Sequence, residues 1–188
     1  SPFTTASIGA TVDYRDVPQN PRGGGRYHVA VARYAGNRPD RAPHSFTRVD
    51  VELEQHLSAW KRQRVITLRA VASSAIADRG HEVPFYLQPT LGGSRLLRGF
   101  VTDRFRDRTL LALQAEYGWD VTPFLNAVAF YEAGTVAPAP RDLQFSNLRR
   151  TYGLGFRFGS ARTVAFRTDV ALGSGEGPRL TMRLNHAF

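Results

Sequence analysis

Apolar and polar residues alternate along much of the chain with a period of two. The clearest stretch is 111–120, in which odd positions such as Leu113 are apolar and even positions such as Glu116 are small or polar. Segments 163–172 and 179–188 repeat the pattern, with charged residues on one phase. Period-two alternation is typical of β-strands with one apolar and one polar face.

Weaker versions of the same alternation predict further strands. They fall at 6–15, 25–35, 45–59, 63–77, 125–135 and 150–159. The chain thus has about nine predicted strands, each of about 9–15 residues, which matches the roughly 9–11 residues of a membrane-crossing strand better than the 5–6 of a soluble sandwich. An outward apolar band is expected from Leu111, Leu113, Val164, Phe166, Val170, Leu180, Met182 and Leu184.

The predicted connections differ in length. Residues 60–63, 120–123 and 159–162 form tight turns, whereas 36–44, 78–109 and 136–149 are long and rich in Pro, Arg and Asp. Outer-membrane barrels have short periplasmic turns and long extracellular loops. If the last strand ends in the periplasm, every short turn is expected inside and every long loop outside.

Composition neither supports nor excludes a membrane barrel. The 188 residues are 42% hydrophobic and 22% charged, as in a soluble domain, but alternating strands dilute the apolar content of a barrel. The net charge of +9 comes almost entirely from scattered Arg, since Lys61 is the only Lys. This scatter argues against a nucleic-acid interface, which gathers its basic residues on one surface. The absence of Cys decides little.

Three motifs stand in order within the longest loop. They are Pro84-Phe85-Tyr86, Gly92-Gly93-Ser94 and Leu97-Arg98-Gly99-Phe100. With this order and spacing, the loop closely resembles the sixth extracellular loop of the BamA/TamA-type outer-membrane surface-antigen family. Two further segments are similar to family motifs: 13–25, with its Arg-Asp and two prolines before Gly-Gly-Gly, and 130–134, in which Glu132 replaces the usual Asp.

The resemblance implies that the 78–109 loop folds back into the barrel and that Arg98 pairs with acidic residues on the wall. Glu116 and Glu132 both lie on the polar phase of neighbouring predicted strands. Two adjacent carboxylates repel each other, and a guanidinium bridges them with better geometry than an ammonium group. We expect Gly99 to let the loop turn tightly beside the wall. The alternative is that Arg98 is one more solvated loop arginine.

The remaining motif residues are Phe100, which follows Gly99, and Gly134, which ends the strand motif at 130–134. The chain finishes on Phe188, and 183–188 resembles the signal that marks outer-membrane barrels for assembly. Alternatively, Phe188 is simply the last residue of the sequence.

The five His show no metal-ligand spacing, and no nucleophile elbow or phosphate loop is present, so we expect no enzyme activity, metal or cofactor.

The resemblance implies an all-β fold: an antiparallel transmembrane β-barrel, with 1–188 as the C-terminal portion, about nine strands, of a sixteen-stranded barrel. An eight-stranded lumen is too narrow for the loop, and an odd strand count would require a parallel closing pair. The chain should therefore not close by itself. Missing N-terminal strands or other chains would complete the barrel.

The function implied by the resemblance is insertion, assembly or translocation of proteins at the bacterial outer membrane. The expected partners are the lipid bilayer, client outer-membrane proteins and periplasmic accessory proteins, with no nucleic acid. Two alternatives stay open. One is a passive anchor for a secreted domain such as a patatin-like phospholipase, and the other is a simple pore.

Overall fold

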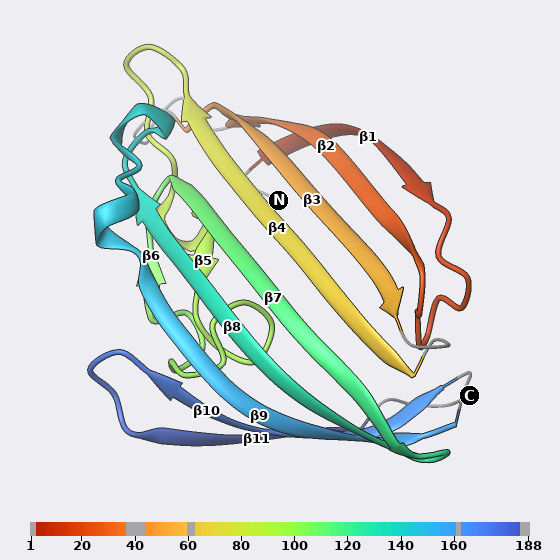
Figure 1. Cartoon of the computed structure of the whole chain (residues 1–188). Coiled ribbons are helices and arrows are strands. Elements are labelled where there is room, and N and C mark those ends of the chain that lie inside the picture. Colours follow the sequence, from red (N-terminus) through yellow and green to blue (C-terminus); the bar gives the residue numbers. More distant parts are fainter. Residues whose placement is uncertain (1–2, 37–43, 60–62, 161–162, 185–188) are drawn as a thin grey trace.

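The computed structural model describes residues 3–36, 44–59, 63–160 and 163–184. Nine long strands form one antiparallel sheet in the order β1-β2-β3-β4-β7-β8-β9-β10-β11 (Figure 1). Their bounds are β1 Phe3–Asp13, β2 Gly24–Gly36, β3 Phe46–Ala59, β4 Arg64–Ala77, β7 Thr109–Thr122, β8 Leu125–Ala137, β9 Arg149–Gly159, β10 Val164–Gly173 and β11 Pro178–Leu184. The predicted all-β fold with about nine strands is confirmed. Among the described residues, none of the helices is long or apolar enough to cross a membrane.

The sheet curves like part of a barrel wall and leaves two edges (Figure 1). Each strand pairs with its neighbours in the sheet order, and within the described residues β1 and β11 do not pair with each other. Because the count is odd, β1 and β11 run in the same direction and could close only as a parallel pair. The prediction that the chain does not close a barrel alone is confirmed.

The two sets of alternating residues lie on opposite faces of the sheet, as predicted. On the convex face, Leu154, Leu180 and Met182 are each at least 60% exposed, whereas Ala112 and Ala171 on the concave face are fully buried. Val164 departs from the prediction, because it lines the concave cavity instead of the outer band. A register shift between Val164 and Phe166 explains this, since a β-bulge changes the face on which the next residues lie.

One boundary and two connections also differ from prediction. The first strand is Phe3–Asp13 and not 6–15. The predicted end of the last strand at Phe188 lies outside the described residues, which end at Leu184. Residues 14–23 form a ten-residue connection at the end of the sheet that carries the tight turns, and 174–177 form a four-residue connection at the other end. The rule that every short turn lies at one end and every long loop at the other is therefore wrong at these two connections.

The connection between β4 and β7 packs on the concave face of the sheet. It holds the 3₁₀ turn η1 Phe85–Leu87 and a small antiparallel ribbon of β5 Thr90–Leu91 and β6 Phe105–Arg106. Another connection, between β8 and β9, contains the 3₁₀ turns η2 Pro140–Asp142 and η3 Phe145–Asn147. The β4–β7 connection reaches deep into the curve of the sheet, where β5 packs against β7 and β8.

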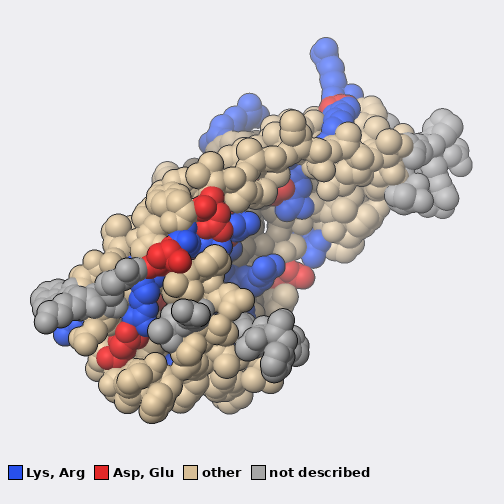
Figure 2. All heavy atoms as spheres, turned by 90° about the vertical axis from the view of Figure 1, so that its right-hand side faces the viewer, with Lys and Arg blue, Asp and Glu red and all other residues tan. Residues whose placement is uncertain are grey.

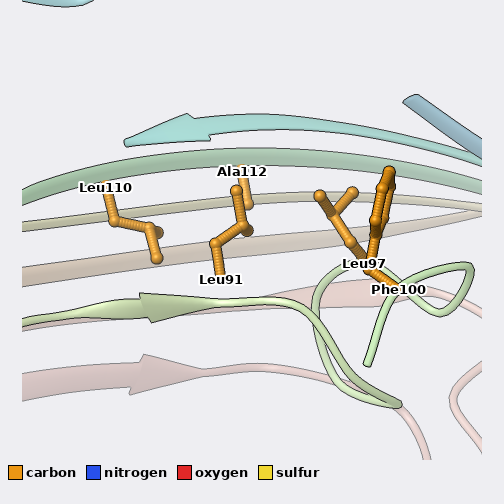
Figure 3. Close-up of a cluster of buried hydrophobic side chains, with 5 residues drawn as sticks. All are labelled: Leu91, Leu97, Phe100, Leu110 and Ala112. Atoms are coloured by element: carbon orange, nitrogen blue, oxygen red, sulfur yellow. The ribbon is translucent and has the colours of Figure 1, made fainter. Parts of the chain in front are cut away.

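Apolar contacts hold this loop to the wall. Leu91, Leu97 and Phe100 from the loop meet Leu110 and Ala112 of β7 in one buried cluster (Figure 3). Each fully buried Leu or Phe contributes about 1.5–3 kcal/mol from area removed from water. The start of the loop is fixed separately, because Val83 and Leu87 pack on Phe46, the first residue of β3.

Candidate functional site

Arg98 of the buried loop forms two hydrogen bonds with the carboxylate of Glu132 on β8. Its Nε donates to Oε1 at 2.7 Å, and its backbone N–H donates to Oε2, also at 2.7 Å. Glu132 is fully buried and Arg98 is 3% exposed. The backbone and the side chain of Arg98 thus bind one oxygen each of the Glu132 carboxylate. Together the two hydrogen bonds fix both the position and the orientation of the loop against the wall.

The guanidinium of Arg98 reaches two more carboxylates. Its Nη2 donates to Oε2 of Glu116 at 3.1 Å, and its Nη1 lies 3.3 Å from Oδ2 of Asp169, an ion pair without hydrogen-bond geometry. The flat face of the guanidinium lies 3.4 Å from the ring centroid of Phe130. Cation–π attraction of this kind strengthens when the charge is removed from water.

Two arginines from the wall share the same carboxylates. Arg157 of β9 donates to Asp169 at 2.8 Å and to Glu116 at 2.9 Å, and Arg167 of β10 donates to Asp169 at 2.9 Å. Three guanidinium groups therefore meet three carboxylates, counting Glu132. Pairing and hydrogen bonding are what make buried charges tolerable.

Electrostatics keep Arg98 charged. Burial alone would lower the pKa of Arg98, but the nearby carboxylates of Glu116, Glu132 and Asp169 outweigh burial and raise the pKa above its ordinary value. The residue is thus a permanent cation, suited to a structural pairing and unsuited to proton transfer.

Glycines allow the loop backbone to touch the wall. A Cβ on Gly99 would lie 2.6 Å from the Cα of Gly173 in β10, so two backbones meet where neither residue has a side chain. Gly99 lies in a tight turn, as expected, which the N–H of Phe100 closes by donating to the carbonyl of Leu97 at 3.1 Å. Its φ is not positive, so the close approach to the wall, and not a left-handed conformation, explains why the residue is glycine. A Cβ on Gly134 would lie 3.1 Å from the Cδ atoms of Leu91.

Among the predicted site residues, the structure brings together Arg98, Glu116 and Glu132, with Gly99, Phe100 and Gly134 packed beside them. Asp169, Arg157 and Arg167 also belong to the site, although they were not assigned to it from the sequence. Their position on the polar phase of β9 and β10 was the available signal. Phe130, the first residue of the 130–134 motif, was also missed.

A second set of contacts closes the turn end of the sheet. The connection 14–23 extends across to two other turns: Arg22 forms a bidentate pair with Asp120, Asn20 Nδ2 donates to the carbonyl of Ser160 at 3.0 Å, and Thr163 Oγ1 donates to Gln19 at 2.7 Å. We call residues 14–23 the strap. It links β1 and β2 to β7 and β9 across about 100 to 140 positions of sequence.

Between the loop and the strap lies a polar cavity of about 430 Å³. Charged side chains gather along the hollow of the curved sheet (Figure 2). Eight arginines line the cavity, against three carboxylates, those of Glu52, Glu54 and Glu116. No group of three or more His, Asp or Glu side chains in the described part of the chain is arranged to hold a metal ion.

These features define a class of protein: a transmembrane antiparallel β-barrel wall with a long loop bound inside it by arginine and carboxylates. The family model for the Omp85 superfamily domain matches residues 3–182, so the chain belongs to the Omp85 superfamily. Family and fold place it in the bacterial outer membrane.

The comparisons with individual proteins show the fold only. The chain is similar to the crystal structure of BamA from Haemophilus ducreyi lacking POTRA domains 1–3, with a TM-score of 0.76 and 15% sequence identity over 95% of this chain. It spans 41% of that BamA chain. A search of curated protein sequences gave no match.

Proposed function

We propose that this chain is part of an outer-membrane barrel that inserts or translocates proteins, and that it works without a cofactor. The observation that carries the proposal is the loop bound inside the curve of the sheet through Arg98. The Omp85 superfamily match supports it, because the resemblance noted in the sequence associates this loop arrangement with barrels that assemble other barrels.

The free edges of the sheet supply the mechanism in this proposal. The described residues of β1 are exposed from Thr4 to Asp13, and β10 is the one described strand that pairs with β11. Unpaired backbone N–H and C=O groups are too costly to leave in hydrocarbon, so further strands complete the barrel. We assign β11 to one side of a weak seam, where its free edge pairs transiently with an incoming strand.

The role of Arg98 in this proposal is structural. A loop fixed to β7, β8 and β10 at once keeps this part of the wall rigid while the seam opens elsewhere. Clients would be unfolded outer-membrane proteins, delivered by periplasmic accessory proteins, and the bilayer itself is the third partner. Phe188 is proposed to carry the assembly signal of the chain.

The proposal is tested by reconstituting the complete protein in liposomes and adding an unfolded outer-membrane barrel as client. Client folding is followed as the growth of a protease-protected band. We expect faster folding than in empty liposomes, and slower folding with Arg98→Ala than with wild type. The control is Arg141→Ala, which removes an arginine that is 89% exposed at η2.

The alternatives give different results in the same liposomes. A simple pore would release a trapped small solute without accelerating client folding. A passive anchor would do neither, although the protein is correctly inserted. Either result would refute the insertion function.

A further inference from the structure

Three arginines form a row across the last three strands of the sheet. Arg157 of β9 is directly opposite Arg167 of β10, and Arg167 is directly opposite Arg183 of β11. All three line the same cavity. Like charges directly opposite on neighbouring strands destabilise a sheet, so the row requires negative charge close by.

The carboxylates of this region are already shared by other arginines. Glu116, Glu132 and Asp169 bind Arg98, Arg157 and Arg167. Arg183 makes no ion pair within the described residues, and its Nη2 is buried without a hydrogen-bond partner there. A buried polar group left unsatisfied destabilises the folded state, and more so when it is charged.

Arg95 adds to the positive charge from the loop side. Three guanidinium groups, those of Arg167, Arg98 and Arg95, lie close enough to repel the charge of Arg183, and the carboxylate of Asp169 lies close enough to attract it. The side chain of Arg95 is exposed to the cavity and has no ion pair in the described part of the chain. The part of the cavity between the loop and β11 therefore carries two cations beyond the balanced network.

We propose that Arg95 and Arg183, backed by Arg167, form a binding site for a phosphate-class oxyanion. The planar fork of donors on a guanidinium matches phosphate oxygens two at a time, and two arginines that line one cavity can hold one anion between them. The cavity volume of about 430 Å³ is ample for a phosphate or diphosphate group. The bound anion offsets the repulsion along the arginine row and supplies an acceptor for the buried Nη2 of Arg183.

The test uses the complete protein in detergent micelles without phospholipid. Inorganic phosphate and pyrophosphate are titrated by calorimetry at constant ionic strength, with chloride as the replaced anion. We expect saturable binding at one site per chain. Arg183→Gln should weaken it about ten-fold or more, since a charge-assisted hydrogen bond contributes about 1.5–3 kcal/mol. Arg141→Gln, which removes the same charge outside the cavity, should leave it unchanged.

Thermal unfolding gives a second readout that separates an anion site from a structural ion pair. In phosphate-free buffer Arg183→Gln should unfold at or above the wild-type temperature, because the substitution removes repulsion. Phosphate should raise the unfolding temperature of wild type but not of the variant. If Arg183→Gln unfolds earlier without phosphate and phosphate has no effect on wild type, Arg183 pairs with a carboxylate elsewhere in the protein and the proposal fails.

A further titration with lipids identifies the source of the anion. Phosphatidylglycerol or uncharged diacylglycerol is added to the same micelles. Binding of inorganic phosphate assigns the site to a soluble anion. A response to phosphatidylglycerol, absent with diacylglycerol and lost in Arg183→Gln, assigns it to a lipid headgroup. No response to any probe, or an equal loss in Arg141→Gln, would overturn the site.

Discussion

At the residue scale, Arg98 makes contacts with both the edges and one face of its guanidinium. The edges meet three carboxylates and the plane lies on Phe130, so the group is both paired and stacked. An ammonium group would provide the charge but neither the fork nor the flat face. The resemblance in the sequence predicted the pairing with Glu116 and Glu132. It could not predict stacking or Asp169, because these depend on side-chain positions across three strands.

Replacing Arg98 should destabilise the protein strongly. Arg98→Ala leaves Glu132 buried without its main partner, and breaking a buried ion pair in this way costs about 3–5 kcal/mol. Arg95→Ala, measured in phosphate-free buffer, should change the free energy of unfolding by less than about 0.5 kcal/mol, as for other exposed sites. Heat-induced loss of the folded band in detergent measures both. Equal losses in the two variants would contradict the role of Arg98.

Gly99 offers a second test at this scale. Gly99→Ala places a Cβ 2.6 Å from the Cα of Gly173, where backbone on both sides cannot yield easily. Overpacking of this kind costs about 1–3 kcal/mol. Trypsin should then cut the loop more readily at Arg104. The matched control is Gly177→Ala, because a Cβ at Gly177 meets nothing within 4 Å. Unchanged cleavage in Gly99→Ala would show that the loop does not depend on this contact.

At the element scale, period-two alternation was enough to find the strands. The alternation between lumen-facing and lipid-facing residues is a local pattern. The strands β7, β10 and β11 could therefore be predicted, each with one polar and one apolar face. Val164 broke the pattern because a bulge changes the phase without changing the residue types. The motif at 13–25 was visible in the sequence, but the contacts of the strap could not be predicted. Its partners are far away in sequence, and such contacts leave no periodic signal.

The strap predicts a coupled pair of substitutions. Arg22→Glu should destabilise the protein because it sets two carboxylates side by side at Asp120, and adding Asp120→Arg should restore most of the loss. Coupling between contacting residues is about 0.5–3 kcal/mol. The double-mutant cycle is measured by chemical unfolding in detergent. Arg141→Glu next to Asp142 is the exposed control, expected to be near neutral. A cycle without coupling would mean that the strap does not bind the turn end.

At the scale of the whole molecule, the open sheet follows from the strand count. An odd number of antiparallel strands leaves the first and last strands parallel, and this could be predicted from the sequence by counting. The depth of the loop in the lumen was implied only by the resemblance. The net positive charge of the cavity could not be predicted, because it depends on which arginines share the same carboxylates.

Hydrogen exchange should show the open edges directly. In the 188-residue chain in detergent, amides of β1 and β11 should exchange faster than those of β3, β4 and β7, which have a strand on both sides. In the complete protein, β1 should become as protected as β2, since further strands then cover its free edge. The proposed seam strand β11 should stay faster than β9. If both edges of the 188-residue chain are as protected as β4, they are paired with each other or with a second copy, and the open sheet is contradicted.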